Sequence, residues 1–79
     1  MEYKIYLMES NNGNNWGGTK LEDCYKDVEY GKKRIEEYAE ILRKIRGSFN
    51  SKYLRLELKK VFRTEIELLD IEDVVVIDL

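Results

Sequence analysis

The chain has 79 residues, of which 43% are hydrophobic and 38% are charged, and its formal net charge is −2. This length allows one domain with a modest core, so residues 1–79 are treated as a single globular unit. The chain contains no histidine, which excludes the Ser-His-Asp and Cys-His arrangements of nucleophilic catalysis.

Cys24 is the only cysteine, so no disulfide can form within the chain. The neighbouring acids Glu22 and Asp23 would raise the pKa of its thiol, which predicts a small, partly buried residue rather than a nucleophile. The first ten residues lack the basic region of a signal peptide, and no run approaches the ~18 apolar residues that a membrane span needs. We therefore expect a cytoplasmic protein.

Residues 2–9 predict a strand, because one set of side chains alternates with another and the segment is rich in aromatic and β-branched residues. The two alternating sets of this strand are Tyr3, Ile5 and Leu7, and Lys4, Tyr6 and Met8. Both of its faces are fairly apolar, which favours a central place in a sheet. Residues 10–18, SNNGNNWGG, predict a loop because Gly and Asn accept the backbone angles of turns. The Asn12-Gly13 dipeptide is typical of a hairpin turn, and the loop also carries the only tryptophan, Trp16.

Residues 19–25 allow two interpretations. Thr19 and Glu22 have the spacing of a capping box, which favours a short helix or turn over residues 20–25. The alternative is a short strand that pairs with the first and closes a hairpin over the Asn/Gly loop. Asp27 would then cap the main helix.

The longest periodic segment runs from Asp27 to Arg46 and predicts the main helix. Cations fill its last turn, and Gly47 suits the position just beyond the end. The apolar residues of this segment recur on one stripe, which we expect to face the core: Val28, Ile35, Tyr38, Ile41, Leu42 and Ile45.

The second half of the chain predicts strands over residues 52–59, 62–68 and 73–79, the last a β-branched run typical of a buried strand. The first two require a turn at Lys59-Lys60 that contains no Gly, Asn or Pro. A second helix over residues 52–62 is the alternative, since Leu54, Leu58, Val61 and Phe62 also fit a helical stripe.

The predicted fold class is therefore α+β: a small two-layer domain with one main helix packed on a mostly antiparallel sheet of three or four strands. One helix can cover only part of such a sheet. The opposite face, with Tyr6 and Met8, is left for solvent or a partner, and a homodimer through that face or through a free strand edge fits this arrangement.

Charge is distributed unevenly along the chain. The net charge is −3 over residues 1–30, +7 over residues 31–63 and −6 over residues 64–79. Such asymmetry can indicate a charged partner. We favour the alternative that neighbours in the fold neutralise each other, because opposite charges paired across strands are common in sheets.

The sequence contains partial matches to two ligand-binding motifs, and neither match is complete. Residues 13–20, GNNWGGTK, have the glycine spacing of a phosphate-binding loop, but the lysine and the hydroxyl residue are exchanged. Asp70, Glu72 and Asp73 offer hard oxygen ligands without the Gly and distal Glu of a calcium loop, and a solvated turn is the favoured interpretation. A small metal-dependent hydrolase is the third functional hypothesis.

The leading hypothesis is a non-enzymatic protein-binding module without a cofactor or metal. An aromatic on a polar loop is typical of a binding loop, although Trp16 could also fold back onto the core. An acidic surface could occupy the basic groove of a nucleic-acid-processing enzyme, as in phage or mobile-element inhibitors of host defence, anti-CRISPR proteins among them. This analogy rests on size, charge and a composition typical of an AT-rich genome. The predicted contact residues are Asn14, Asn15, Trp16, Glu65, Glu67, Asp70, Glu72 and Asp73.

The second hypothesis is a nucleic-acid-binding regulator that uses the basic segment over residues 31–63, with tyrosines stacking on bases. The residues that would meet phosphates are Lys32, Lys33, Arg34, Arg43, Lys44, Arg46, Lys52, Arg55, Lys59, Lys60 and Arg63.

Overall fold

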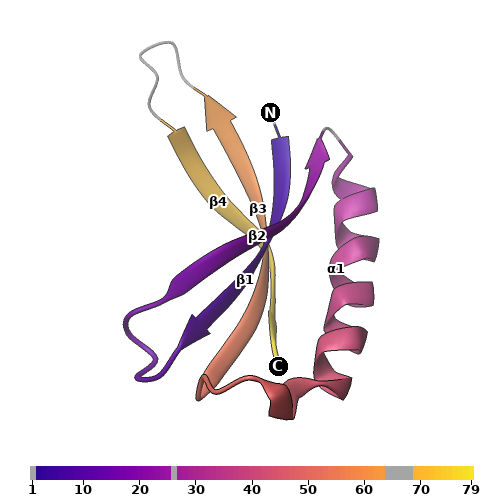
Figure 1. The fold of residues 1–79 in the computed structure, drawn as a ribbon. Coiled ribbons are helices and arrows are strands. Elements are labelled where there is room, and N and C mark those ends of the chain that lie inside the picture. The colour runs from indigo at the N-terminus through magenta and orange to yellow at the C-terminus, as the bar shows by residue number, and fades with distance from the viewer. Residues whose placement is uncertain (1, 26, 64–68) are drawn as a thin grey trace.

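The computed structural model describes residues 2–25, 27–63 and 69–79. Its elements follow in the order β1 (Glu2–Ser10), β2 (Gly17–Tyr25), α1 (Val28–Lys44), the short 3-10 helix η1 (Arg46–Ser48), β3 (Tyr53–Arg63) and β4 (Leu69–Asp78). The four strands form one twisted antiparallel sheet in the order β2-β1-β3-β4, and α1 lies along one of its faces (Figure 1). The predicted two-layer α+β domain is confirmed.

The segment from residue 19 to residue 25 belongs to β2, so the favoured short helix or turn over residues 20–25 is wrong and the hairpin alternative is correct. β1 is apolar on both faces and pairs on both sides, with β2 and with β3. Pairing with β1 satisfies the backbone groups on one side of this segment, and Cys24 is buried, which together outweigh a local capping signal.

The main helix forms where it is predicted, with ends one or two residues shorter. Asp27 is its N-cap, and its carboxylate accepts hydrogen bonds from the amides of Glu29 and Tyr30. The predicted apolar stripe is too wide, because Ile41 and Ile45 are 56% and 46% exposed. Ile41 lies about 100° around the helix from the buried Leu42, and Ile45 is the C-cap, just beyond the last helical residue.

β3 is one continuous strand of 11 residues. The predicted turn at Lys59-Lys60 is therefore wrong, and so is the alternative helix over residues 52–62. Both lysines pair with β1 on one side and with β4 on the other, so their backbones are held in a central ladder. Residues 62 and 63 end β3, and the rest of the strand predicted over 62–68 lies outside the described residues. β4 begins at Leu69, so residues 70–73 form strand rather than the expected turn.

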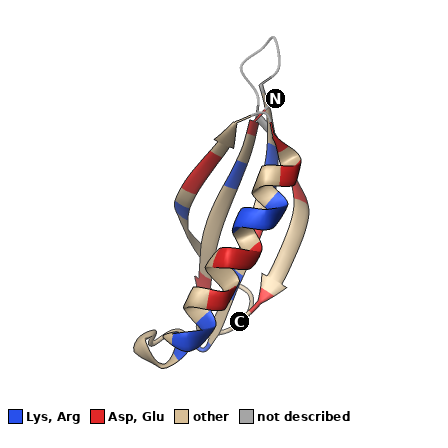
Figure 2. Ribbon diagram, turned by 90° about the vertical axis from the view of Figure 1, so that its right-hand side faces the viewer, with Lys and Arg blue, Asp and Glu red and all other residues tan. Residues whose placement is uncertain are grey.

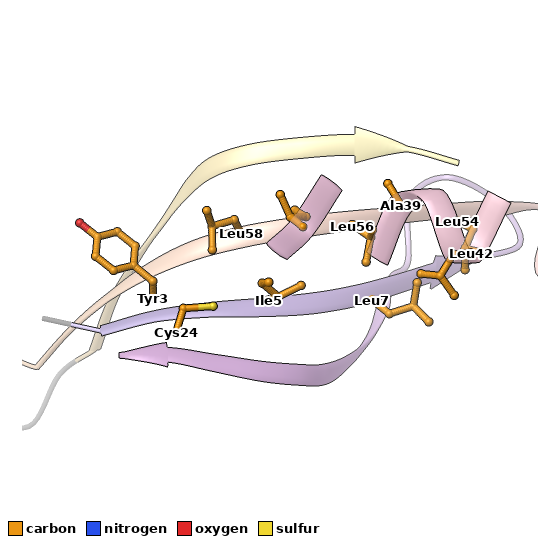
Figure 3. Close-up of a cluster of buried hydrophobic side chains, with 10 residues drawn as sticks. Tyr3, Ile5, Leu7, Cys24, Ala39, Leu42, Leu54, Leu56 and Leu58 are labelled. Carbon is orange, nitrogen blue, oxygen red and sulfur yellow. The ribbon is translucent and has the colours of Figure 1, made fainter. Parts of the chain in front are cut away.

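The core lies between α1 and the sheet, where side chains from β1 and β3 alternate toward the helix (Figure 3). Its largest fully buried aliphatic side chains are Ile5, Ile35, Leu56 and Leu58. Gly31 allows α1 to approach the sheet closely, because a Cβ at this position would lie 2.9 Å from Cδ1 of Leu58. Gly31 therefore lowers the helix propensity of this segment but permits the close contact between α1 and β3.

A carboxylate on β2 fixes the rotation of the helix. Glu22 accepts hydrogen bonds from the hydroxyls of Tyr30 and Tyr38, at 2.7 and 2.8 Å, and from Nε of Arg34 at 2.9 Å. The three donors stand one helical turn apart on one side of α1. Burial alone would raise the pKa of Glu22, but these donors outweigh it and leave the pKa below its ordinary value.

Replacing Gly31 by alanine tests the close packing of α1. Alanine gains about 1 kcal/mol of helix propensity, while overpacking against Leu58 costs about 1–3 kcal/mol, so we expect net destabilisation in urea unfolding. In a Leu58→Ala background the space is free, and the same substitution is expected to stabilise. Stabilisation by Gly31→Ala in the otherwise unchanged chain would contradict the packing account.

Replacing Glu22 by glutamine tests the attachment of the helix. Because the folded pKa lies below the unfolded value, the carboxylate stabilises the fold above its ordinary pKa of 4.5, and this stabilisation is lost as the pH falls through the lowered folded pKa. Glu22→Gln is expected to cost about 1–3 kcal/mol at pH 7 and to flatten the acid side of the stability profile. The exposed Glu36→Gln is the control, and equal profiles for both variants would refute the attachment.

Candidate partner-binding surface

The loop between β1 and β2 is held in shape by its own polar side chains. Oγ of the buried Ser10 accepts a hydrogen bond from the amide of Gly13 at 2.9 Å. Oδ1 of Asn12 accepts hydrogen bonds from the amides of Asn14 and Asn15 at 2.8 and 2.9 Å. Gly13 has a φ of +77°, in the left-handed region that a glycine adopts without strain. The loop is therefore fixed by Asn and Ser turns.

Trp16 folds back over the face of the sheet that α1 leaves uncovered, here called the open face. Its Nε1 donates a hydrogen bond to the carbonyl of Gly13 at 3.2 Å. Its ring lies 4.0 Å from the guanidinium carbon of Arg55 and 6.4 Å from the ring of Tyr53. Trp16 therefore covers a cation of β3 and stays partly exposed, on the side of the sheet away from the main core.

A chain of charged contacts runs along the open face from Arg55 to Asp73. Glu57 is only 1% exposed, and its carboxylate lies 2.8 Å from Nη2 of Arg55 and 3.0 Å from Nζ of Lys59. Lys59 also lies 2.8 Å from Oδ1 of Asp73 on β4. Burial alone would lower the pKa of Lys59, but Asp73 and Glu57 outweigh it and leave the pKa raised. The predicted contact residues Trp16 and Asp73 are thus connected through β3.

A cavity of about 380 Å³ lies between the loop and the end of β4. Trp16 and Tyr53 supply aromatic walls, and Asp78 and Leu79 bring the end of the acidic segment to the same place. The remaining lining residues are Gly13, Lys52 and Leu54. The Trp16 loop and the C-terminal end of β4 therefore line the same hollow.

β4 forms one edge of the sheet and is only partly covered. Helix α1 packs mainly on β3, β1 and β2, and Figure 1 shows it along one side of the sheet. On β4, Ile71 and Val76 are 55% and 45% exposed. No side-chain hydrogen bond or ion pair of Glu72 or Asp78 is found among the described residues, and both are exposed. The strand therefore presents apolar and acidic side chains together.

Of the other predicted contact residues, those that the structure describes do not line the cavity beside Trp16. Asn14 and Asn15 are exposed at the tip of the loop. The backbone of Asp70, in β4, pairs with that of Phe62 in β3. Glu65 and Glu67 lie outside the described residues.

Several basic side chains of the segment 31–63 are already paired with acids. Arg55 and Lys59 contact Glu57, and Arg34 contacts Glu22 and Glu37. Asp73 joins the acidic segment to the basic one through Lys59, as expected for neighbours that neutralise each other. Figure 2 shows basic and acidic residues in alternating bands along α1. No ion pair is found among the described residues for three cations of the helix: Lys33, Arg43 and Lys44.

Tyr53 and Arg55 are the site residues that sequence analysis did not identify as contacts of Trp16. The alternation over residues 52–59 places both on the face opposite Leu54 and Leu56. The missing information was the register, which sets Ser10 beside Tyr53 and so brings the loop over this face. Cys24 is a free, buried thiol, and its pKa is raised by burial and by Glu22 and Asp23, as predicted.

Within residues 2–25, 27–63 and 69–79, no group of three or more Cys, Asp or Glu side chains is arranged to hold a metal ion. Of the residues 13–20, the last four already belong to β2, so this loop leads into a strand, whereas a phosphate-binding loop leads into a helix. No helix in the described part of the chain is both long and apolar enough to cross a membrane. Comparisons with protein-family models, curated proteins and solved structures find no match.

Replacing Ser10 by alanine tests whether the loop positions Trp16. The loss of a buried acceptor is expected to cost about 1–2 kcal/mol of stability and to loosen the ring from Arg55. Since Trp16 is the only tryptophan, acrylamide quenching of its fluorescence reports this position alone and is expected to increase. The exposed Ser48→Ala is the control, and unchanged quenching in Ser10→Ala would contradict the role of Ser10.

Proposed function

We propose that this protein is a non-enzymatic protein-binding module whose contact surface combines the acidic edge strand β4 with the Trp16 loop. The observation that supports this most strongly is the shared cavity, in which Trp16 and Tyr53 meet Asp78 and Leu79. Aromatic side chains beside a partly apolar, acidic edge are typical of protein-binding surfaces.

The charge of this surface suggests a basic partner. No ion pair of Glu72 or Asp78 is found among the described residues, and both are exposed, so a partner's Lys or Arg side chains can approach them. The groove of a nucleic-acid-processing enzyme has this character, and acidic inhibitors can bind it quickly through electrostatic steering. A phage or mobile-element inhibitor of host defence, similar in kind to anti-CRISPR proteins, is the specific role we propose.

The ion pairs on the open face favour this proposal over nucleic-acid binding. A phosphate backbone would have to displace Glu57 or Asp73 from Arg55 and Lys59 before it could use those cations. A protein partner that contacts the acidic and apolar side chains of β4 leaves these ion pairs intact.

A pull-down from the host lysate tests the proposal, with the whole chain as bait and the retained proteins quantified by mass spectrometry. We expect one basic protein in stoichiometric amount, released by increasing salt. Glu72→Lys is expected to reduce its recovery about tenfold. Glu36→Lys, the same charge change on an exposed position of α1, is expected to leave recovery unchanged. Recovery of no stoichiometric partner, or equal loss in both variants, would contradict the proposal.

A further inference from the structure

We propose that the partner binds as an additional strand along the outer edge of β4, through an extended segment that alternates aliphatic and basic side chains. This inference rests on the proposed protein-binding function and specifies how the contact is made. It draws on the direction of the backbone groups of β4, on the side chains of its two faces and on its charge.

The outer edge of β4 offers backbone groups in the pattern that a new strand requires. The amide of Leu79 donates a hydrogen bond to the carbonyl of Leu54 at 2.9 Å, so it is directed at β3. Hydrogen-bonding directions alternate along an antiparallel strand. The backbone N–H and C=O groups of Ile77 are therefore also directed at β3, whereas those of Val76 and Asp78 are directed away from the sheet. Their ladder with β3 is regular from Val75 to Asp78.

The two faces of β4 set the side chains of the incoming strand. On the helix-covered face Val75, Ile77 and Leu79 are half-buried, and aliphatic side chains beside them would extend the core. On the open face Asp73 and Asp78 stand on either side of Val76, because the irregularity at Val74 shifts the alternation. Asp73 is already paired with Lys59, so a Lys or Arg side chain of the partner would pair with Asp78. Side chains of a strand alternate between faces, so the partner alternates in the same way.

The other edge and a second copy of this chain fit less well. β2 has two irregularities in its pairing with β1, against one in the pairing of β4 with β3. β2 also carries Lys20 and is tied to the helix through Glu22. Bulges and lysines of this kind protect edges from pairing. Pairing of β4 with its own copy would bring like charges together, because residues 64–79 carry six acids and no base.

Two synthetic peptides of about ten residues, the length of β4, test the mode of binding. One alternates Val and Lys, and the other contains the same residues as a block of Val followed by a block of Lys. Binding to the whole protein is followed by ¹⁵N-resolved NMR and amide hydrogen exchange. We expect the alternating peptide to bind more tightly and to slow exchange at Val76 and Asp78 at least about tenfold.

Val76→Pro and Val76→Ala form a matched pair on the protein. Proline removes an outward N–H that β3 does not use, which an edge strand can tolerate, and is expected to weaken binding of the alternating peptide about tenfold. Alanine keeps the N–H and is expected to change binding less than about threefold. Should the proline variant not fold, Val76→Lys keeps the N–H but repels the peptide's lysines, and is expected to weaken binding as well.

Equal binding of the two peptides without slowed exchange would overturn strand addition while leaving an acidic contact surface in place. Shifts confined to α1, or no binding of either peptide, would also overturn it. The host-lysate pull-down judges the proposed function separately, because it requires no particular backbone geometry.

Discussion

One helix is too narrow to cover a sheet of four strands, and this difference in width determines which apolar and charged side chains remain exposed. α1 has 17 residues and packs mainly on β3, β1 and β2. Gly31 lets it approach Leu58 closely, and Glu22 fixes its rotation through Tyr30, Arg34 and Tyr38. The helix is thus held toward the β2 side. The apolar residues of β4 at the opposite edge are left only partly covered.

The face without a helix is closed by charges. Glu57 is buried at the centre of this face between Arg55 and Lys59, and Trp16 covers the guanidinium of Arg55. A buried carboxylate is costly unless it is paired, so these cations are held for structural reasons. The charged side chains of Arg55, Glu57 and Lys59 are therefore paired with one another on the open face. On β4 and beside the cavity at Trp16 lie exposed apolar side chains and acids for which no ion pair is found among the described residues.

The sequence was most informative where one local pattern dominated. The main helix, its cap at Asp27 and the strand character of residues 2–9 follow from periodicity and capping chemistry. Residues 20–25 and the Lys59-Lys60 junction were mispredicted because their structure depends on pairing with β1, which no local pattern records. Trp16 could be identified as unusual from its loop, but its contacts with Tyr53 and Arg55 depend on the register between β1 and β3.

The central claim is that β4 is a free edge, and amide hydrogen exchange of the unbound protein measures this directly. The amides of Ile77 and Leu79, directed at β3, should exchange slowly, while those of Val76 and Asp78 should exchange at nearly the rate of an unprotected amide. Strong protection of all four amides would show that another chain or segment already covers the edge. That result would contradict the account, and so would uniformly fast exchange, which would mean that β4 does not pair with β3.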